Sequence, residues 1–297
     1  CEFRTFIQRF LGESPNAKTN AVEEPDLFAP QGVENGAESG NLSTNYPQSS
    51  HKTLQDTEHT YVLVDNLKDA TALCGNLLTF PVIAFDTETT GIDAMSAEMV
   101  GMSFAVEGGR AWYVAVPENQ AEAQEFVDSF RPFFENEGQI KVGQHLKYDL
   151  TILSHYGVEV KGELFDTMLA HYVVEPEQRH NMDHLAETYL HYRTIHIEEL
   201  IGTGRQQKNM RDLAPSEICD YACEDADVNL RLYPILREKM AECDVTDVFS
   251  KIEMPLLPVL ARIEQNGVRL DTEALRQTGD DFRARLQTLE EEVYALA

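Results

Sequence analysis

The stretch from residue 82 to residue 91 constrains the fold more than any other part of the chain. Residues 82–85 are apolar and lead into an Asp-Thr-Glu sequence, and the Thr-Thr-Gly at 89–91 then interrupts the run. This pattern is typical of a buried strand that ends at a site. Side chains two apart on a strand share one face, so Asp86 and Glu88 point the same way.

Two carboxylates side by side repel each other, and burying both without a cation lowers stability. A divalent cation removes that difficulty, and oxygen-only ligands favour magnesium or manganese over zinc. The alternative is a solvated Asp and Glu at a strand end, which is the commoner case for an isolated Asp-x-Glu. Acidic partners elsewhere in the chain decide between these two interpretations.

The composition is that of a globular chain with a large excess of negative charge. The 297 residues include 51 acidic and 24 basic ones, a formal net charge of −27. This excess alone argues against nucleic acid, because phosphate binding draws on Lys and Arg. It does not exclude nucleic acid, since a site that holds divalent cations must itself be acidic. No apolar run reaches the roughly 20 residues of a membrane span, so we expect no membrane contact.

The five cysteines are odd in number and form no Cys-x-x-Cys, which favours a reducing cytoplasm. Cys219 and Cys223 are therefore expected to be buried thiols. His180 and His184 are four apart, but they lack further ligands at zinc spacing and favour a polar helix start. The chain begins with Cys1 and not Met, and we expect a processed or excised piece.

Composition and pattern divide the chain into four parts, at residues 1–11, 12–58, 59–243 and 244–297. Three Phe residues in the first part fall three and four apart, as on one helix face. The second part is rich in Ser, Asn, Glu, Pro and Gly and predicts a disordered linker. The third alternates strand and helix patterns. The fourth holds two helical patterns, at 252–265 and 272–297, and looks like the start of another domain.

The third part predicts an α/β fold with a mixed sheet flanked by helices. Strands are expected at 61–64, around Asp86, at 99–106 and at 111–116. A hairpin turn at 107–110 makes the last three of these an antiparallel meander, with the Asp86 strand at or near the middle of the sheet. A further short strand is expected before 146. Helices are expected at 67–78, 121–135, 146–156, 166–174, 182–190 and 215–242.

Two further motifs supply acids at helical spacing. His145 and Asp149 are four apart and are expected on one face of a helix. Tyr221 and Asp225 have the same spacing on the long helix that begins near Pro215. Each motif alone is weak, because an Asp on a helix is usually solvated. Together with the Asp-x-Glu strand they provide four acids and one phenol on three separate elements.

These motifs carry a specific resemblance. Phe-Asp-Thr-Glu-Thr at 85–89, Gly-Gln-His-Leu-Lys-Tyr-Asp at 143–149 and Tyr-Ala-Cys-Glu-Asp-Ala-Asp at 221–227 resemble the three exonuclease motifs of the proofreading domain of bacterial DNA polymerase I, family A. This is the tyrosine-bearing branch of the DEDD exonucleases. Residues 253–268 resemble the segment that opens the polymerase domain, which would make the last helix the start of its thumb.

Several properties follow as expectations from this resemblance. It extends from about residue 61 to the end of the chain and implies a ribonuclease H-like fold. Residues 2–6 more loosely resemble the tail of the preceding flap-nuclease domain. The motifs of nucleotide addition are absent from this sequence.

The resemblance also implies the site residues. Two divalent ions, Mg²⁺ or Mn²⁺, would clamp the scissile phosphate. Asp86 would bridge both ions, with Glu88 and Asp225 on the first and Asp149 on the second. Tyr221 and Glu88 would orient the attacking hydroxide, and the product would be a nucleoside 5′-monophosphate. The terminal nucleotides would contact Thr89, Ile92, Gln144, His145, Tyr148, Arg179 and Ile197.

One residue departs from the family pattern, and two other functions compete. The family usually has Asn where this chain has His145, which affects contacts to the strand but not the metal acids. The expected function is proofreading of a single-stranded or frayed DNA 3′ end, with the remainder of the polymerase chain as partner, at the nucleoid in the cytoplasm. The alternatives are an exoribonuclease similar to RNase D and a catalytically silent domain that supports the polymerase.

Overall fold

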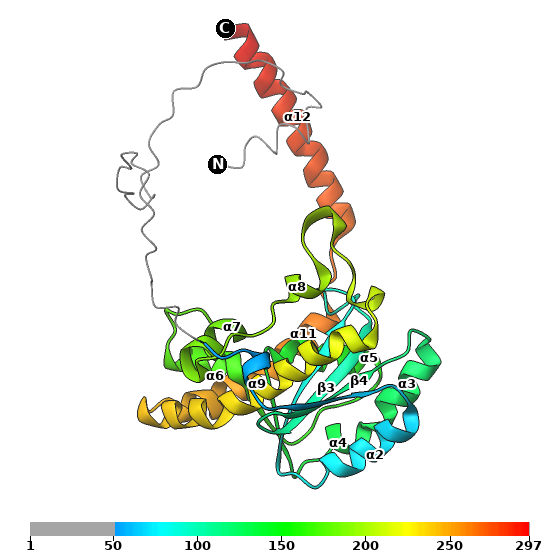
Figure 1. Ribbon diagram of the computed structural model, residues 1–297. Coiled ribbons are helices and arrows are strands. Elements are labelled where there is room, and N and C mark those ends of the chain that lie inside the picture. The colour runs from blue at the N-terminus through cyan, green and yellow to red at the C-terminus, as the bar shows by residue number, and fades with distance from the viewer. Residues whose placement is uncertain (1–50, 297) are drawn as a thin grey trace, which may run out of the picture. The chain divides into compact units, whose positions relative to one another are not determined.

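A six-stranded mixed sheet forms the centre of the protein (Figure 1). The structure, a computed structural model, describes residues 51–296, apart from the side chain of Arg205. The expected segment 1–11 and most of the expected linker 12–58 lie outside the described residues. The strands are β1 (Thr60–Val64), β2 (Val82–Thr89), β3 (Met99–Glu107), β4 (Arg110–Ala115), β5 (Ile140–Gly143) and β6 (Glu163–Asp166).

The strands lie in the order β1-β4-β3-β2-β5-β6. β2, β3 and β4 form the predicted antiparallel meander, while β1 pairs with β4, β5 with β2 and β6 with β5 in parallel. β2 is therefore an inner strand, as expected. The pairing of β2 with β3 shifts register between Glu88 and Thr89, so the strand is irregular where its acidic residues lie.

Helices cover both faces of this sheet (Figure 1). The longest one beside the sheet, α9, crosses β1 to β4 on one face. The α-helices are α2 (Leu67–Leu77), α3 (Gln120–Ser129), α4 (Arg131–Phe134), α5 (Leu146–His155), α6 (Thr167–Val174), α7 (Met182–Leu185), α8 (Ile197–Ile201), α9 (Pro215–Glu242), α10 (Thr246–Val248), α11 (Met254–Asn266) and α12 (Thr272–Leu296).

The two faces of β2 have opposite character. Phe85 packs edge-on against Phe133 and Phe134 of α4, with ring centroids 6.4 Å and 5.4 Å apart. All three rings are fully buried. Because side chains alternate along a strand, the next residue, Asp86, is turned toward α9. The aromatic cluster therefore fixes the strand, and the strand presents its acids on the other side.

The structure differs from the sequence-based expectations at two helices. The segment expected as one helix at 121–135 is split at Phe130, because Pro132 has no N–H to donate to the carbonyl one turn earlier. The segment expected at 182–190 is α-helical only to Leu185. It then widens to a π-helical turn over Ala186–Leu190 and ends at His191, whose φ is 49°.

The carboxyl-terminal helices behave differently from each other. α11 packs on α5 and buries Met254, Leu257 and Ala261. α12 has no buried residue among those described. Within residues 51–296, no helix combines the length and the apolar character that a bilayer crossing requires.

Candidate active site

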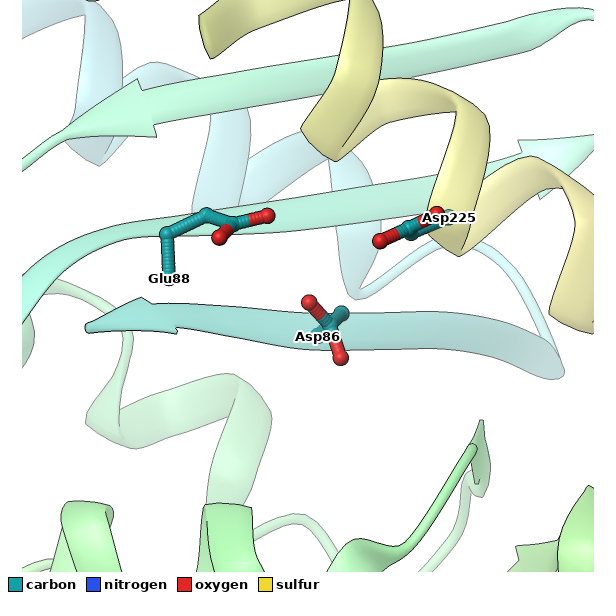
Figure 2. A group of neighbouring side chains, drawn as sticks. All are labelled: Asp86, Glu88 and Asp225. Carbon is teal, nitrogen blue, oxygen red and sulfur yellow. The ribbon is translucent and has the colours of Figure 1, made fainter. Parts of the chain in front are cut away.

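Three carboxylates from two elements meet between β2 and α9. Asp86 and Glu88 lie on β2 and Asp225 on α9, and one oxygen of each lies within 4.8 Å of the others. Figure 2 shows the three side chains turned toward a common space. The spacing of two along the strand and the crossing of α9 over β2 bring them together. Elsewhere in residues 51–296 no comparable group of potential metal ligands occurs.

The three carboxylates are buried and repel one another, so a bound cation would stabilise their charged forms. Burial raises the pKa of Asp86 to about 7. Burial also raises the pKa of Glu88 well above its usual value, and the charge of Asp86 adds to the effect. Asp225 is affected in the same way, by burial first and then by Asp86 and Glu88. Oε1 of Glu88 is buried without a hydrogen-bond partner among the described residues. An oxygen-only set with an unpartnered carboxylate oxygen is compatible with a divalent metal ion.

Asp149 lies on the other side of β2 from this triad. Its Oδ1 accepts hydrogen bonds from the backbone N–H of Thr87 at 3.1 Å and from its hydroxyl at 2.6 Å. Burial raises its pKa, and the charge of Asp86 is the next cause. Asp149 is therefore electrostatically coupled to Asp86, although it is not part of the group within 4.8 Å.

The start of α5 is held tightly, and this places Asp149. β5 ends at Gly143, where a Cβ would lie 2.4 Å from the Leu146 side chain, so a larger residue would collide with that buried side chain at the start of α5. Asp166 of β6 accepts from the N–H of Leu146 at 2.7 Å. Its other oxygen accepts from two N–H groups at the start of α6. One buried carboxylate therefore caps two helices.

Tyr221 lies one helical turn before Asp225 on α9 and is partly buried. Burial raises the pKa of its phenol well above the usual value, and the charges of Asp225, Glu88 and Asp86 add to this. The phenol therefore remains protonated at neutral pH and is a hydrogen-bond donor beside the acids.

A cleft of about 840 Å³ opens at the end of β2. Of the residues expected to contact a strand, five line it: Thr89, Ile92, His145, Tyr148 and Ile197. The side chain of Ile92 is 99% exposed, so it is available to a ligand and not part of the core. The hydroxyls of Thr89 and Tyr148 lie within hydrogen-bond distance of each other and of the carbonyl of Gly91. Each hydroxyl has one proton, so one of them donates to the other, which in turn donates to the carbonyl. This network shapes the wall of the cleft.

The other two expected contact residues do not line this cleft. The amide of Gln144 donates to the carbonyl of His180 at 2.7 Å and accepts from the Thr167 hydroxyl. Arg179 is exposed in the loop between α6 and α7. The structure therefore gathers five of the seven around one hollow and uses Gln144 to hold a neighbouring loop.

The spacing predicted that His145 and Asp149 share one face of a helix, and this prediction is wrong because His145 lies outside the helix. It precedes α5 as the N-cap residue, with φ 58° in the left-handed region. The helix pattern could not reveal this, because the strand turns directly into the helix and one residue must absorb the change of direction. Asn, Asp and His tolerate this conformation better than other non-glycine residues do.

Sequence patterns did not predict the second wall of the cleft. Gln207, Lys208, Asn209 and Met210 line it, from an irregular segment without apolar periodicity. Thr87 was also missed as the residue that holds Asp149, because the bond joins residues 62 apart in the chain. Both depend on long-range packing.

Comparison with known proteins agrees with this geometry. A family of proteins described as 3′-5′ exonuclease matches residues 61–241. DNA polymerase I of Pseudomonas aeruginosa is 41% identical over 227 residues, which are 73% of this chain and 25% of that protein. The chain thus spans about a quarter of the length of this relative.

Two solved structures share the fold. The polymerase domain of Pol1 from M. smegmatis, in complex with DNA primer-template and dNTP, has a TM-score of 0.63 at 20% identity and covers 78% of this chain and 37% of its own. Escherichia coli RNase D, an exoribonuclease, has a TM-score of 0.56 at 16% identity and covers 70% of this chain and 52% of its own. These likenesses confirm the predicted mixed sheet flanked by helices.

The family match covers most of the folded part, and the Pseudomonas protein is 41% identical. Both confirm the resemblance that the sequence motifs indicated. The chain belongs to the 3′-5′ exonuclease family, to which the exonuclease domain of bacterial DNA polymerase I also belongs.

Proposed function

We propose that this chain is a metal-dependent 3′-5′ exonuclease that removes mispaired nucleotides from a DNA 3′ end, as the proofreading part of a DNA polymerase I. The convergence of Asp86, Glu88 and Asp225 within 4.8 Å carries the proposal, with Asp149 on the far side of Asp86. The domain lies at residues 59–243, and 244–297 begin the polymerase domain. The partners are DNA and the remainder of the polymerase chain, at the nucleoid in the cytoplasm.

The residues have separate roles in the proposed reaction. Two divalent ions, Mg²⁺ or Mn²⁺, would supply an activated water and would stabilise the charge on the phosphate and the leaving 3′ oxygen. Asp86, Glu88 and Asp225 would hold one ion, and Asp86 and Asp149 would hold the other. Tyr221 keeps its phenolic proton and would donate a hydrogen bond to the attacking oxygen, which fixes the direction of attack. Thr87 keeps the Asp149 carboxylate in place through its two hydrogen bonds.

The cleft accounts for selection of a mispaired end. It is lined by the exposed Ile92 and by Ile197, which stack on or wedge against any base without reading its edge. A strand end must therefore be single-stranded to enter, and a mispaired end separates from its template at lower cost. Specificity arises from fraying and not from base recognition.

An exoribonuclease is the main competing function, because RNase D shares the fold. The 41% identity to a DNA polymerase I favours DNA. Comparing rates on DNA and RNA strands of matched sequence distinguishes the two, and we expect the faster rate on DNA. A catalytically silent domain is disfavoured, because the chain keeps all four acids and Tyr221, and three of the acids lie within 4.8 Å of one another.

The test is digestion of a 5′-labelled single-stranded oligonucleotide with and without Mg²⁺. We expect stepwise shortening from the 3′ end with release of nucleoside 5′-monophosphates, only when the metal is present. Asp86→Ala is expected to abolish shortening while the circular dichroism spectrum stays unchanged. Shortening by Asp86→Ala at the normal rate would show that the site is misassigned.

A further inference from the structure

The second wall of the cleft is a polar segment, residues 202–212, that is fixed at several points. The backbone N–H of Lys208 donates to the carbonyl of Ile201 at 2.8 Å. The amide of Asn209 donates to the carbonyl of Thr90 at 2.6 Å, directly after β2. The guanidinium of Arg211 donates to the carbonyls of Met99 and Val116. Although this segment is irregular, its position relative to the acids is well defined.

Lys208 brings a positive charge to this wall. It lines the cleft, is exposed, and has no carboxylate within ion-pair distance among the residues that the structure describes. Lys147, which lines the neighbouring hollow, has its ammonium 2.6 Å from Glu264. A paired lysine is partly neutralised, whereas the ammonium of Lys208 keeps its full attraction for an anion.

The positive charge of Lys208 lies in a region of negative electrostatic potential. The chain carries a net charge of −27, and the end of the cleft holds a cluster of carboxylates. A phosphate backbone that approaches such a surface is repelled unless local positive charge offsets the repulsion. Lys208 lines the same cleft as Glu88, and its backbone N–H donates to the carbonyl of Ile201, another lining residue. Because a 3′-5′ exonuclease leaves only one nucleotide downstream of the bond that is cut, the other phosphates of a strand in this cleft lie upstream of that bond.

We propose that Lys208, held by the segment 202–212, binds a backbone phosphate of the substrate strand upstream of the scissile phosphate. This proposal rests on the exonuclease function proposed above and names a binding residue for it. Lys is a point charge on a flexible stem, so the contact is independent of base sequence. It adds to binding equally in the ground state and the transition state, and it takes no part in the chemistry.

The first test compares Lys208→Met with Lys68→Met. Lys68 is exposed on α2, which packs with α3 and α4 and does not line the cleft, so both variants change the net charge equally. For single-stranded DNA we expect Lys208→Met to raise KM severalfold with kcat unchanged, the signature of lost uniform binding. The slope of log KM against log salt should fall by about 0.7, the value for one phosphate contact to a single strand. Lys208→Arg should restore both values, and Lys68→Met should leave both unchanged.

The second test uses substrate length. If Lys208 binds an upstream phosphate, shortening the oligonucleotide one residue at a time reaches a length at which wild type and Lys208→Met have the same KM. A defect that persists down to the dinucleotide would overturn the upstream assignment. Equal KM and salt slope for Lys208→Met and Lys68→Met on long strands would overturn the proposal altogether, as would a fall in kcat alone.

A third measurement separates this proposal from the proposed function. Binding of a labelled strand is followed by fluorescence anisotropy with Ca²⁺ in place of Mg²⁺, so that no turnover is needed. Weaker binding by Lys208→Met than by Lys68→Met supports the phosphate contact even if the wild type releases no mononucleotides. Mononucleotide release with equal binding by the two variants supports the exonuclease and overturns the role of Lys208.

Discussion

The charge of Asp86 acts on three other carboxylates. Its pKa is raised to about 7 by burial, and its own charge raises the pKa of Glu88, Asp149 and Asp225. Without a cation, the folded protein therefore holds protons that the unfolded chain would release. The arrangement lowers stability in the absence of metal, which is expected of a site built to bind cations.

The first prediction concerns Asp86→Asn in EDTA. A carboxyl whose folded pKa is about 7 binds its proton more tightly than in the unfolded chain, where the pKa is near 3.9. Its favourable contribution is complete below about pH 4 and is lost as pH rises through 7. Asn does not titrate, so the variant does not lose stability in this way. We therefore expect the difference in free energy of unfolding between Asp86→Asn and the wild type to grow from pH 5 to pH 8, to on the order of 2 kcal/mol in favour of the variant.

Urea unfolding of both proteins at the two pH values measures this difference. His171, whose pKa is lowered by burial, titrates in both proteins and cancels in the comparison. Saturating Mg²⁺ should shrink or reverse the advantage, because the ion binds the folded wild type. An advantage of the same size at pH 5 and pH 8 would contradict the account.

The second prediction concerns His145, whose φ of 58° suits few side chains. His145→Asn should leave the free energy of unfolding unchanged, because Asn also tolerates the left-handed conformation. His145→Val should lower it by about 1–2 kcal/mol, because a β-branched residue is strained there. Thermal or urea unfolding measures both. Equal stability of the Asn and Val variants would show that the backbone does not require a special residue at this position.

The position of α5 depends on Asp166. Three backbone N–H groups donate to this buried carboxylate, one at the start of α5 and two at the start of α6. Asp166→Ala should lower the free energy of unfolding by about 2 kcal/mol, because it leaves these donors unpaired. It should also lower kcat, since α5 carries Asp149. Exposed Asp65, removed by Asp65→Ala, is the control and should change neither value.

Regular elements were the part of the fold that pattern alone could predict. The apolar strand before Asp86, the Gly-Gly hairpin after β3 and the Pro215 start of α9 each have local chemistry that determines them. β6 was missed, because four residues at a sheet edge carry little periodicity. The split at Phe130 was missed as well, although Pro132 could have indicated it.

Only the part of the site that depends on local spacing and on the family resemblance could be predicted. The acids at strand and helix spacing follow from local geometry and resemblance, and the structure brings Asp86, Glu88 and Asp225 together. The bond from Thr87 to Asp149 and the wall that contains Lys208 join parts of the chain that only the folded sheet brings together. No local pattern contains that information.

Helix α11 joins the sheet and its helices to the last helix, α12. We expect it to belong to a following domain, and it also packs on α5 and β6, with Leu257 buried and Glu264 paired with Lys147 of α5. Leu257→Ala should lower the free energy of unfolding by about 2–3 kcal/mol, because it leaves a buried cavity. Glu264→Gln should cost less than about 1 kcal/mol, because the pair is solvent-exposed.

Urea unfolding followed at both a backbone and a side-chain signal checks this prediction. A loss in Leu257→Ala that appears in a single cooperative transition means that α11 folds with the body that holds the acids. If Leu257→Ala has the stability of the wild type, α11 does not contribute to the stability of that body.

The proposed function requires that the carboxylates of β2, α5 and α9 hold divalent cations. Crystals of the chain soaked in Mn²⁺ test it through the anomalous scattering of that ion. We predict two peaks, one among Asp86, Glu88 and Asp225 and one between Asp86 and Asp149, and none at these positions in Asp86→Ala. Ordered manganese elsewhere with no peak beside Asp86 would contradict the account.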